Sequence, residues 1–429
     1  SMPINYPRGV RDLFPNEAIF REELINKIKE VFQNFGFYPI NTPVFESLDV
    51  LLAKNTIGEE NKLIYKINGE NLGLRYDHTI SLARFFAMHQ EIQLPFKRYV
   101  IDKAWRKEEP QKLRYREFTQ ADIDILGGNE IYTTAEVIAA VAKLFEKINI
   151  NYEIHLNDRQ ILDALFESLK IEQDLAIKTM RIIDKSDKAS IDQISDMLKE
   201  LNLGSEIVNQ IIMFITSSTS NEDKLKYAED LLKEKAKPFI ERLNKLLKII
   251  NLYGLKTNII IDFSIVRGID YYNSLIFEFK LSETKNPSLS IAGGGRYDNL
   301  ISIYSNKPTP AVGASIGVDR ILDYLNYSSY QKHTYSKLFI AYINDSNYEY
   351  AVKIASLLRD NGINADLNVS NKNITNQLYY ANMLKFKYAM IIGDKEEKAN
   401  TINLKDLEIG SEQSISLNNL IQTLKKLNI

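Results

Sequence analysis

Residues 160–250 constrain the fold most, because their pattern differs from that of the segments on either side. This stretch consists almost entirely of Leu, Ile, Lys, Glu, Asp and Ser at helical spacing, and its single proline is Pro238. Strand-like segments precede it, among them KLIYKI, LGLRYD and PFKRYVIDKAWR, and strand character returns at TNIIIDFSIV and LSIAGGGRYDNLI. The pattern predicts a strand-rich domain that a small helical module interrupts.

Residues 326–336 (NYSSYQKHTYS) are polar and show no periodicity, which is typical of a linker. After them strand-like segments alternate with helix-like ones, from KLFIAYI through YAMIIG to TINLKDL. This alternation predicts a small α/β domain with a mixed or parallel sheet. We therefore expect a first domain over residues 1–328, a helical insertion at 160–250, a linker at 329–335 and an α/β domain at 336–429.

The composition narrows the class of protein. With 429 residues the chain is too long for one ordinary core, so two or three domains are expected. Its 45% hydrophobic and 26% charged residues are typical of a soluble globular protein. The absence of cysteine excludes disulfides and fits a reducing, cytoplasmic setting, and no apolar run approaches the roughly 18 residues of a membrane span. The net charge of −2 means that any surface for nucleic acid has to be local.

The segment SIVRGIDYYNSLIFEF, residues 264–279, combines a charged start with a strand-like pattern. Its alternating residues Tyr271, Leu275, Phe277 and Phe279 predict a half-buried strand. The preceding Arg267-Gly268-Ile269-Asp270 is either a salt-bridged start of that strand or a charged group directed into a pocket. We expect Asp270 to be the buried partner of an arginine.

Two other polar segments allow two interpretations each. WRKEEPQKLRYREFTQADIDIL contains Arg106, Glu108, Arg114 and Arg116, which suit either phosphate oxygens or a solvated hairpin with cross-strand ion pairs. In LRYDHT, residues 74–79, the acid and the threonine suit either a binding turn or the N-cap of the next helix.

The glycine-rich segments carry little specificity by themselves. AGGGRYDNL at 292–300 predicts a tight turn, and PAVGASIGVDR at 310–320 predicts close backbone packing that leads into a helix with Arg320. Neither matches a Walker loop or a dinucleotide fingerprint. The four histidines are scattered without metal-ligand spacing, and no Ser-His-Asp elbow is present, so we expect no resident metal site.

Taken in order, these segments resemble the motifs of class II aminoacyl-tRNA synthetases. The first motif resembles FGFYPINTPVFE, with Pro43 at the family's dimer interface, the second WRKEEPQKLRYREF, and the third GASIGVDR. RGIDYY and GGGRYDNL resemble the histidyl-tRNA synthetase family in particular, and the likeness covers essentially the whole chain. Four residues depart from the family pattern. Leu113 replaces a glycine, Asp319 a glutamate and Trp105 a phenylalanine, and His78 stands where the family more often has a small or apolar residue.

The resemblance implies an α+β catalytic domain with a mainly antiparallel sheet, a C-terminal anticodon-binding α/β domain with a mixed sheet, and a cytoplasmic homodimer. It implies that ATP, with Mg²⁺ between its phosphates, and L-histidine form histidyl-adenylate, from which the histidyl group passes to tRNA(His). The implied catalytic residues are Arg106 and Arg267. Those for ATP are Arg106, Glu108, Arg114, Phe118 and Arg320. Those for histidine are Asp77, His78, Thr79, Arg106, Gln120, Asp124, Arg267, Tyr271 and Tyr272. Those for the acceptor end of tRNA are Gln111, Lys112 and Arg114.

Two other functions are compatible with parts of this pattern. The first is the non-catalytic, synthetase-like regulatory subunit of ATP phosphoribosyltransferase, which typically loses the catalytic motifs and lacks the C-terminal domain. Here Arg106, Glu108, Arg267 and Arg320 are present and an α/β domain follows the linker. The second is a class II synthetase for another amino acid, such as proline, threonine or glycine, against which RGIDYY argues.

Overall fold

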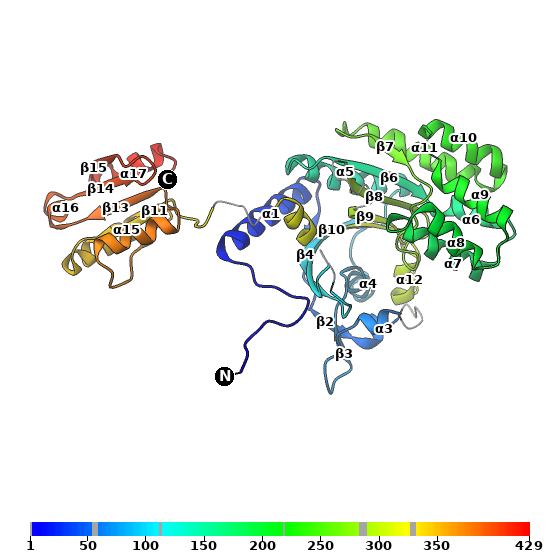
Figure 1. Ribbon diagram of the computed structural model, residues 1–429, viewed down its shortest axis with the longest axis horizontal. Helices are drawn as coiled ribbons and strands as arrows, with labels where there is room; N and C mark the ends of the chain where they lie inside the picture. Colours follow the sequence, from blue (N-terminus) through cyan, green and yellow to red (C-terminus); the bar gives the residue numbers. More distant parts are fainter. Residues whose placement is uncertain (1, 54–58, 111–113, 218, 283–289, 327–331) are drawn as a thin grey trace. The chain divides into compact units, whose positions relative to one another are not determined.

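The computed structural model describes residues 2–53, 59–110, 114–217, 219–282, 290–326 and 332–429. The chain divides into two compact units (Figure 1). One comprises Ser1–Arg11 with Leu24–Leu325, and the other comprises Asp12–Glu23 with Asn326–Ile429. Residues 12–23, which the sequence pattern assigns to the first domain, cluster with the second unit and include the first turns of helix α1 (Pro15–Asn34).

The first unit is built on an eight-stranded sheet with the order β1-β4-β5-β10-β9-β8-β6-β7. Neighbouring strands from β4 to β6 are antiparallel, whereas the edge strands β1 and β7 run parallel to their neighbours. The strands are β1 (Tyr38–Pro39), β4 (Phe96–Trp105), β5 (Glu117–Leu126), β6 (Tyr152–Asp158), β7 (Ile259–Ile261), β8 (Leu275–Leu281), β9 (Ser290–Arg296) and β10 (Ala311–Gly317). The mainly antiparallel sheet predicted for this domain is confirmed.

The two faces of this sheet differ in character near its centre. Helix α5 (Glu130–Lys147), capped by the side chain of Asn129, packs on β5, β9 and β10. Along β5 the buried apolar residues Ala121 and Ile123 alternate with Asp122 and Asp124. Successive side chains of a strand point to opposite faces, so the carboxylates lie on the face away from the apolar residues. That polar face carries the cavity described below.

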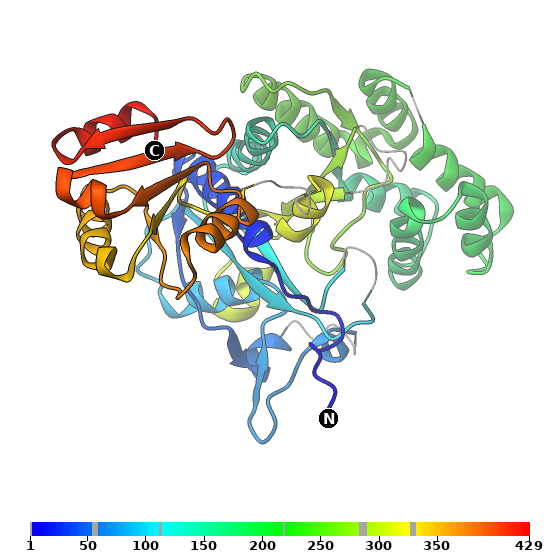
Figure 2. The same ribbon diagram turned by 60° about the vertical axis from the view of Figure 1, so that its left-hand side comes forward.

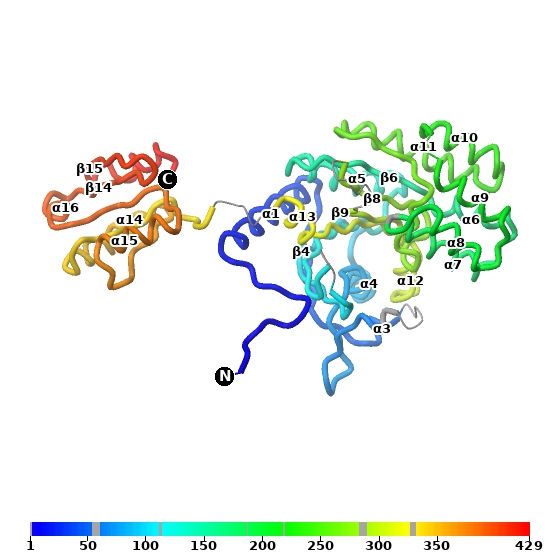
Figure 3. The backbone as a smooth tube through the Cα atoms, in the orientation of Figure 1, coloured from blue at the N-terminus to red at the C-terminus, as the bar shows by residue number. Residues whose placement is uncertain are grey.

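Six α-helices lie between β6 and β7 and span Arg159 to Asn251 in the described chain. They lie together beyond the β6–β7 edge of the sheet in Figures 1 and 2, and the green part of the trace in Figure 3 leaves and rejoins the sheet there. Caps mark several of their starts, including Asp158, Ser190 and Ser220, and Pro238 lies in a first turn. The helices are α6 (Arg159–Ser168), α7 (Gln173–Ile183), α8 (Ile191–Lys199), α9 (Ser205–Thr216), α10 (Asn221–Leu232) and α11 (Lys237–Asn251), with 3-10 turns η1 (Asp184–Asp187) and η2 (Lys233–Lys235).

Shorter elements surround one end of the polar face. Helix α4 (Thr79–Met88) packs against α12 (Leu300–Ser305), with Phe86 and Ile301 in their shared core. The remaining elements of this unit are β2 (Phe45–Ser47), α2 (Leu48–Leu51), α3 (Glu59–Leu63), β3 (Leu72–Leu74) and α13 (Val318–Tyr324). Strands β2 and β3 form a separate antiparallel pair.

The second unit contains a five-stranded mixed sheet with the order β12-β11-β13-β14-β15. Strand β11 pairs in parallel with β12 and β13, and β14 pairs antiparallel with β13 and β15, which confirms the predicted mixed sheet. Its elements are β11 (Leu338–Tyr342), η4 (Asp345–Asn347), α14 (Tyr348–Asp360), β12 (Asp366–Leu367), α15 (Ile374–Met383), β13 (Tyr388–Ile392), α16 (Asp394–Ala399), β14 (Thr401–Asp406), β15 (Glu412–Ser416) and α17 (Leu417–Lys426). Across the residues described, no helix combines the length and apolarity that crossing a membrane requires.

Candidate active site

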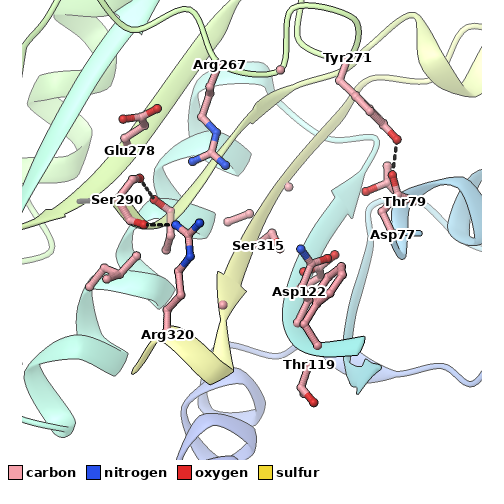
Figure 4. A pocket seen from close by; sticks show the side chains of 18 of the residues that line it. Asp77, Thr79, Thr119, Asp122, Arg267, Tyr271, Glu278, Ser290, Ser315 and Arg320 are labelled. Atoms are coloured by element: carbon pink, nitrogen blue, oxygen red, sulfur yellow. Dashed lines mark hydrogen bonds between the residues drawn. The ribbon is translucent and has the colours of Figure 1, made fainter. Parts of the chain in front are cut away.

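A cavity of about 490 Å³ opens on the polar face of the eight-stranded sheet (Figure 4). Its floor is formed by residues of β5, β8, β9 and β10. Its walls come from the start of α4, from the residues that flank the loop between β4 and β5, and from the segment before β8. Segments far apart in the sequence therefore meet in one cavity.

One row of residues crosses the floor from strand to strand. Asp122 on β5 pairs with Ser315 on β10, which pairs with Gly293 on β9, which in turn pairs with Glu278 on β8. A Cβ atom added to Gly293 would lie 1.4 Å from Nη1 of Arg267, so a side chain there would occupy the place of the guanidinium. The glycine run lies inside β9 and makes room for an arginine, which corrects the tight turn expected from its sequence.

A second glycine, Gly313 on β10, leaves space in the same way for a carboxylate. It pairs with Asp124, and a Cβ atom there would lie 2.0 Å from Oδ2 of that residue. Close backbone packing, which the sequence predicts for this segment, thus has a particular reason at Gly313.

The segment Arg267–Tyr272 is a turn and not the first part of a strand, because β8 begins at Leu275. Gly268 has φ +60°, and its carbonyl oxygen accepts from the backbone N–H groups of Tyr271 (2.9 Å) and Tyr272 (2.8 Å). A Cβ atom on Gly268 would lie 2.4 Å from the ring of Tyr272. The turn directs the Arg267 guanidinium into the cavity (Figure 4).

Arginines from three parts of the chain line the cavity, and their positions are supported by the backbone. Nη1 of Arg320 donates to the carbonyl oxygen of Ser290 at 2.8 Å, and Nε of Arg106 donates to that of Tyr76 at 3.1 Å. The guanidinium of Arg106 also lies 5.0 Å from the ring centroid of Phe118. With Arg267, these groups give the cavity a cationic wall suited to phosphate oxygens.

Asp77 and Asp122 lie across the cavity from Arg267 and Arg320 (Figure 4). The hydroxyl of Tyr271 donates to the carboxylate of Asp77, whose other oxygen accepts from Ile80 N–H at 3.2 Å (Figure 4). Asp77 therefore accepts a hydrogen bond from the first turn of α4 and also lines the cavity, a position that suits both interpretations of LRYDHT. Burial, with the neighbouring Asp124 carboxylate, raises the pKa of Asp122 to about 7. Burial also raises the pKa of Asp124, against the opposing effect of Arg98.

The structure brings most of the predicted site residues into this one cavity. Its lining includes Asp77, Thr79, Arg106, Glu108, Arg114, Phe118, Gln120, Asp124, Arg267, Tyr271, Tyr272 and Arg320. Gln111, Lys112 and Leu113 lie outside the described residues.

His78 does not belong to this lining. It is buried, and its Nε2 lies 3.0 Å from the carbonyl oxygen of Asp102. Burial, together with the charges of Arg98 and Arg75, lowers the pKa of His78 to about 4, so its ring is neutral near pH 7. Its side chain connects the turn before α4 to the backbone of β4 and is not among the groups that line the cavity.

Asp270 has the arginine partner expected for it but is not buried. Its carboxylate lies 3.2 Å from Nη2 of Arg181 on helix α7, and the two side chains are 35% and 44% exposed. The side chain of Arg159, at the start of α6, binds the backbone of the same turn. Its Nη1 donates to the carbonyl oxygens of Ile269 (2.5 Å) and Tyr272 (2.7 Å). The helical insertion therefore anchors the segment that carries Arg267.

Several lining residues were not among those predicted. Asp122, Glu278 and Ser315 belong to the floor, and Tyr115 and Asp319 to the wall. The signal for Asp122 was the period-two spacing from Gln120 and Asp124, which puts all three on one face. Glu278 interrupts the apolar residues Phe277 and Phe279 in the same way.

An antiparallel sheet that places Arg106 and Arg320, from distant motifs, in one cavity defines the catalytic fold of a class II aminoacyl-tRNA synthetase. A family model for histidyl-tRNA synthetase matches residues 9–321, and one for an anticodon binding domain matches residues 337–427. The chain therefore belongs to the histidyl-tRNA synthetase family.

Individual relatives are similar to this chain over nearly their full lengths. The histidine–tRNA ligase of Korarchaeum cryptofilum is 35% identical over 99% of both chains, and that of Pyrococcus horikoshii is 35% identical over 98% of both. The crystal structure of histidyl-tRNA synthetase from a Nostoc species, 26% identical, has a TM-score of 0.86 and covers 99% of this chain and 100% of its own. A Bacillus halodurans structure described as an ATP phosphoribosyltransferase regulatory subunit/histidyl-tRNA synthetase shares the fold, with a TM-score of 0.76 at 20% identity over 92% of this chain and 99% of its own.

Proposed function

We propose that the chain is a histidine–tRNA ligase that activates L-histidine with ATP and transfers the histidyl group to the 3′ end of tRNA(His). One observation carries this proposal: a single cavity is lined by Arg106, Arg114, Arg267 and Arg320 together with the carboxylates of Asp77, Asp122 and Asp124 and the tyrosines Tyr271 and Tyr272. The cations suit a triphosphate, and the acids and tyrosines suit an amino acid with a polar ring.

In the first step a carboxylate oxygen of histidine attacks the α-phosphorus of ATP, and the bond to pyrophosphate breaks with its electrons on the leaving group. Charge on the phosphoryl oxygens is stabilised by cations that are already in place. We assign Arg106 and Arg267 to the α-phosphate, and Arg114 and Arg320 to the outer phosphates. The bond from Arg320 to the Ser290 carbonyl keeps this charge oriented before ATP arrives.

Other residues that line the cavity suit the adenine base and a magnesium ion. We assign the Phe118 ring to adenine stacking and Glu108 to the nucleotide. Within the described parts of the chain no group of three or more His, Cys, Asp or Glu residues could hold a metal ion. The cavity carboxylates Glu108 and Glu278 fit Mg²⁺ that is bound mainly by phosphate oxygens and water. Such an ion would neutralise phosphate charge when bound.

For the amino acid, we assign Asp77, Thr79 and Gln120 to the α-ammonium group. We assign Asp124 and Tyr272 to the imidazole nitrogens, with Tyr271 as a wall. A site that hydrogen-bonds both ring nitrogens rejects analogues that lack them by roughly 10⁴–10⁵.

In the second step a ribose hydroxyl of the terminal nucleotide attacks the carbonyl carbon of histidyl-adenylate, and AMP leaves. We assign Gln111, Lys112 and Arg114 to the acceptor end of tRNA(His), and the second unit to its anticodon. We also propose a cytoplasmic homodimer. Exposed apolar side chains on either side of Pro43, Tyr38 (68% exposed) and Phe45 (47% exposed), support a subunit contact at this edge.

ATP–pyrophosphate exchange with a panel of amino acids tests the proposal. Exchange that depends on histidine, and not on proline, threonine or glycine, is expected. The alternative of a regulatory subunit is not favoured, because the motif arginines are present and a family model for an anticodon binding domain matches residues 337–427. A chain that shows no histidine-dependent exchange would revive it.

A further inference from the structure

The N-terminal segment Pro7–Arg11 contacts the part of the chain that follows Arg106. The backbone N–H of Arg116 donates to the carbonyl oxygen of Gly9 at 2.8 Å. Gly9 has φ +86°, and a Cβ atom there would lie 2.7 Å from Cγ of Arg116. A glycine is therefore needed at this crossing, for its backbone conformation and for the close approach.

Within this segment, Arg11 contacts residues that are distant in the sequence. Its Nη1 donates to Oδ1 of Asp323 at 3.1 Å, and its Nη2 lies 3.5 Å from Oδ1 of Asp319. Its guanidinium carbon also lies 4.2 Å from the ring centroid of Tyr115. Because the hydroxyl of Tyr115 donates to Oδ2 of Asp323 at 3.3 Å, the arginine, the tyrosine and the aspartate form a closed set of contacts.

These partners adjoin the residues assigned to the outer phosphates of ATP. Tyr115 follows Arg114, and Asp319 precedes Arg320 at the start of α13. Tyr115 and Asp319 also line the cavity. Arg11 thus joins the segment that carries one phosphate-binding arginine to the helix that carries the other.

The contact is also electrostatic, because Arg11 lies between two carboxylates of α13. Asp319 and Asp323 lie one turn apart on α13, and their side chains are each 16% exposed. Without a cation between them, two partly buried carboxylates would repel each other and attract the nearby arginines of the site. The Arg11 side chain, 24% exposed, offsets both charges.

We propose that Arg11 is a positioning residue for ATP: it keeps Arg114 and Arg320 on their sides of the cavity without touching the nucleotide. The proposal rests on the proposed function only for the identity of the ligand, a nucleoside triphosphate. It predicts that loss of Arg11 weakens ATP binding selectively, whereas a purely structural role would weaken ATP and histidine alike.

The test is calorimetric titration of the full chain with MgATP and, separately, with L-histidine. Arg11→Ala is expected to bind MgATP about tenfold more weakly, because displaced phosphate ligands lose their alignment, and to bind histidine within about twofold of the wild type. Arg11→Lys keeps a charge between the two carboxylates and is expected to recover part of the affinity. Arg8→Ala, which removes an exposed ion pair with Glu109 in the same segment, is the matched control and is expected to match the wild type.

Unchanged ATP affinity in Arg11→Ala, or equal weakening of both ligands, overturns the proposal. If Arg11→Ala does not fold, Asp323→Asn removes the other end of the contact and is expected to show the same selective loss. If both single variants fold, the double variant is expected to bind MgATP no more weakly than either single one, since the two residues act through one contact. Histidine-dependent exchange by the wild type is measured separately, so its absence would refute the proposed function without deciding the role of Arg11.

Discussion

The guanidinium of Arg98 and the carboxylate of Asp124 lie directly opposite each other on β4 and β5, with Nε donating to Oδ1 at 2.9 Å. Both side chains are almost completely buried, at 2% and 3% exposed. The hydroxyl of Tyr297 donates to the other carboxylate oxygen at 2.5 Å, and Nη2 of Arg98 donates to the carbonyl oxygen of His78 at 3.1 Å. Asp124 is therefore oriented from beneath the cavity by an arginine that does not line it.

Arg98→Met is expected to reduce the free energy of unfolding by about 3–5 kcal/mol, because it leaves a buried carboxylate without its cation. Urea unfolding near neutral pH measures this. Arg181→Met is the matched control, since its pair with Asp270 is exposed and is expected to contribute at most about 1 kcal/mol. Similar losses in the two variants would contradict the importance given to burial.

Arg267→Ala is expected to slow histidine-dependent pyrophosphate exchange by roughly 10²–10³, as removal of one preorganised charge stabiliser does. The fold should persist, because the turn is held by backbone contacts to Arg159 and not by the guanidinium of Arg267. Near-normal exchange in a folded variant would exclude Arg267 from the reaction.

Gly293→Ala is expected to impair exchange nearly as much as loss of Arg267, although the residue carries no functional group. Its Cβ would lie 1.4 Å from Nη1 of Arg267, so the guanidinium would have to move from the position that it occupies in the cavity. The double variant Gly293→Ala/Arg267→Ala should then be no slower than Arg267→Ala alone. Additive losses in exchange rate would mean that Gly293 acts by another route.

The sequence identified the chemistry of the site better than its geometry. Side-chain types and motif order were enough to select Arg106, Arg267 and Arg320, which the structure brings to one cavity. The strand expected to include Tyr271 begins only at Leu275, and Tyr271 lies in a turn, because the positive φ of Gly268 allows its carbonyl to accept two backbone bonds. Period-two spacing alone does not reveal such a local closure.

Local sequence patterns do not predict contacts between segments that are distant in the chain. The effect of Gly293 depends on a guanidinium 26 positions earlier in the chain, and that of Arg11 on Asp323 at the other end of the unit. Asp124, which was selected, owes its orientation to Arg98, which was not. Arg98 belongs to a segment with a strand-like sequence, but only the strand register places it opposite Asp124.

Deletion of residues 330–429 is expected to reduce aminoacylation of tRNA(His) much more than pyrophosphate exchange. The second unit has its own core around Ile340, Leu358 and Met390, and the cavity is lined entirely by the first. Steady-state assays of both reactions on one preparation measure the difference. Equal losses in the two reactions would argue against an anticodon-binding role for the second unit.

The stability of the chain is expected to depend on pH through Asp122. Its pKa is raised from 3.8 to about 7 in the folded protein, mainly by burial, so between these values the folded state binds more protons than the unfolded state. The contribution of Asp122 is therefore fully present below about pH 4 and is lost as the pH rises through 7, by about 1.4 kcal/mol for each unit of pKa difference. Asp122→Asn removes this titration. In urea titrations, the free energy of unfolding of this variant, relative to that of the wild type, is therefore expected to increase as the pH is raised from 4.5 to 7.5. Asp360→Asn, at an exposed position on α14, is the control and should run parallel to the wild type; a parallel course for Asp122→Asn would show that Asp122 is ionised throughout.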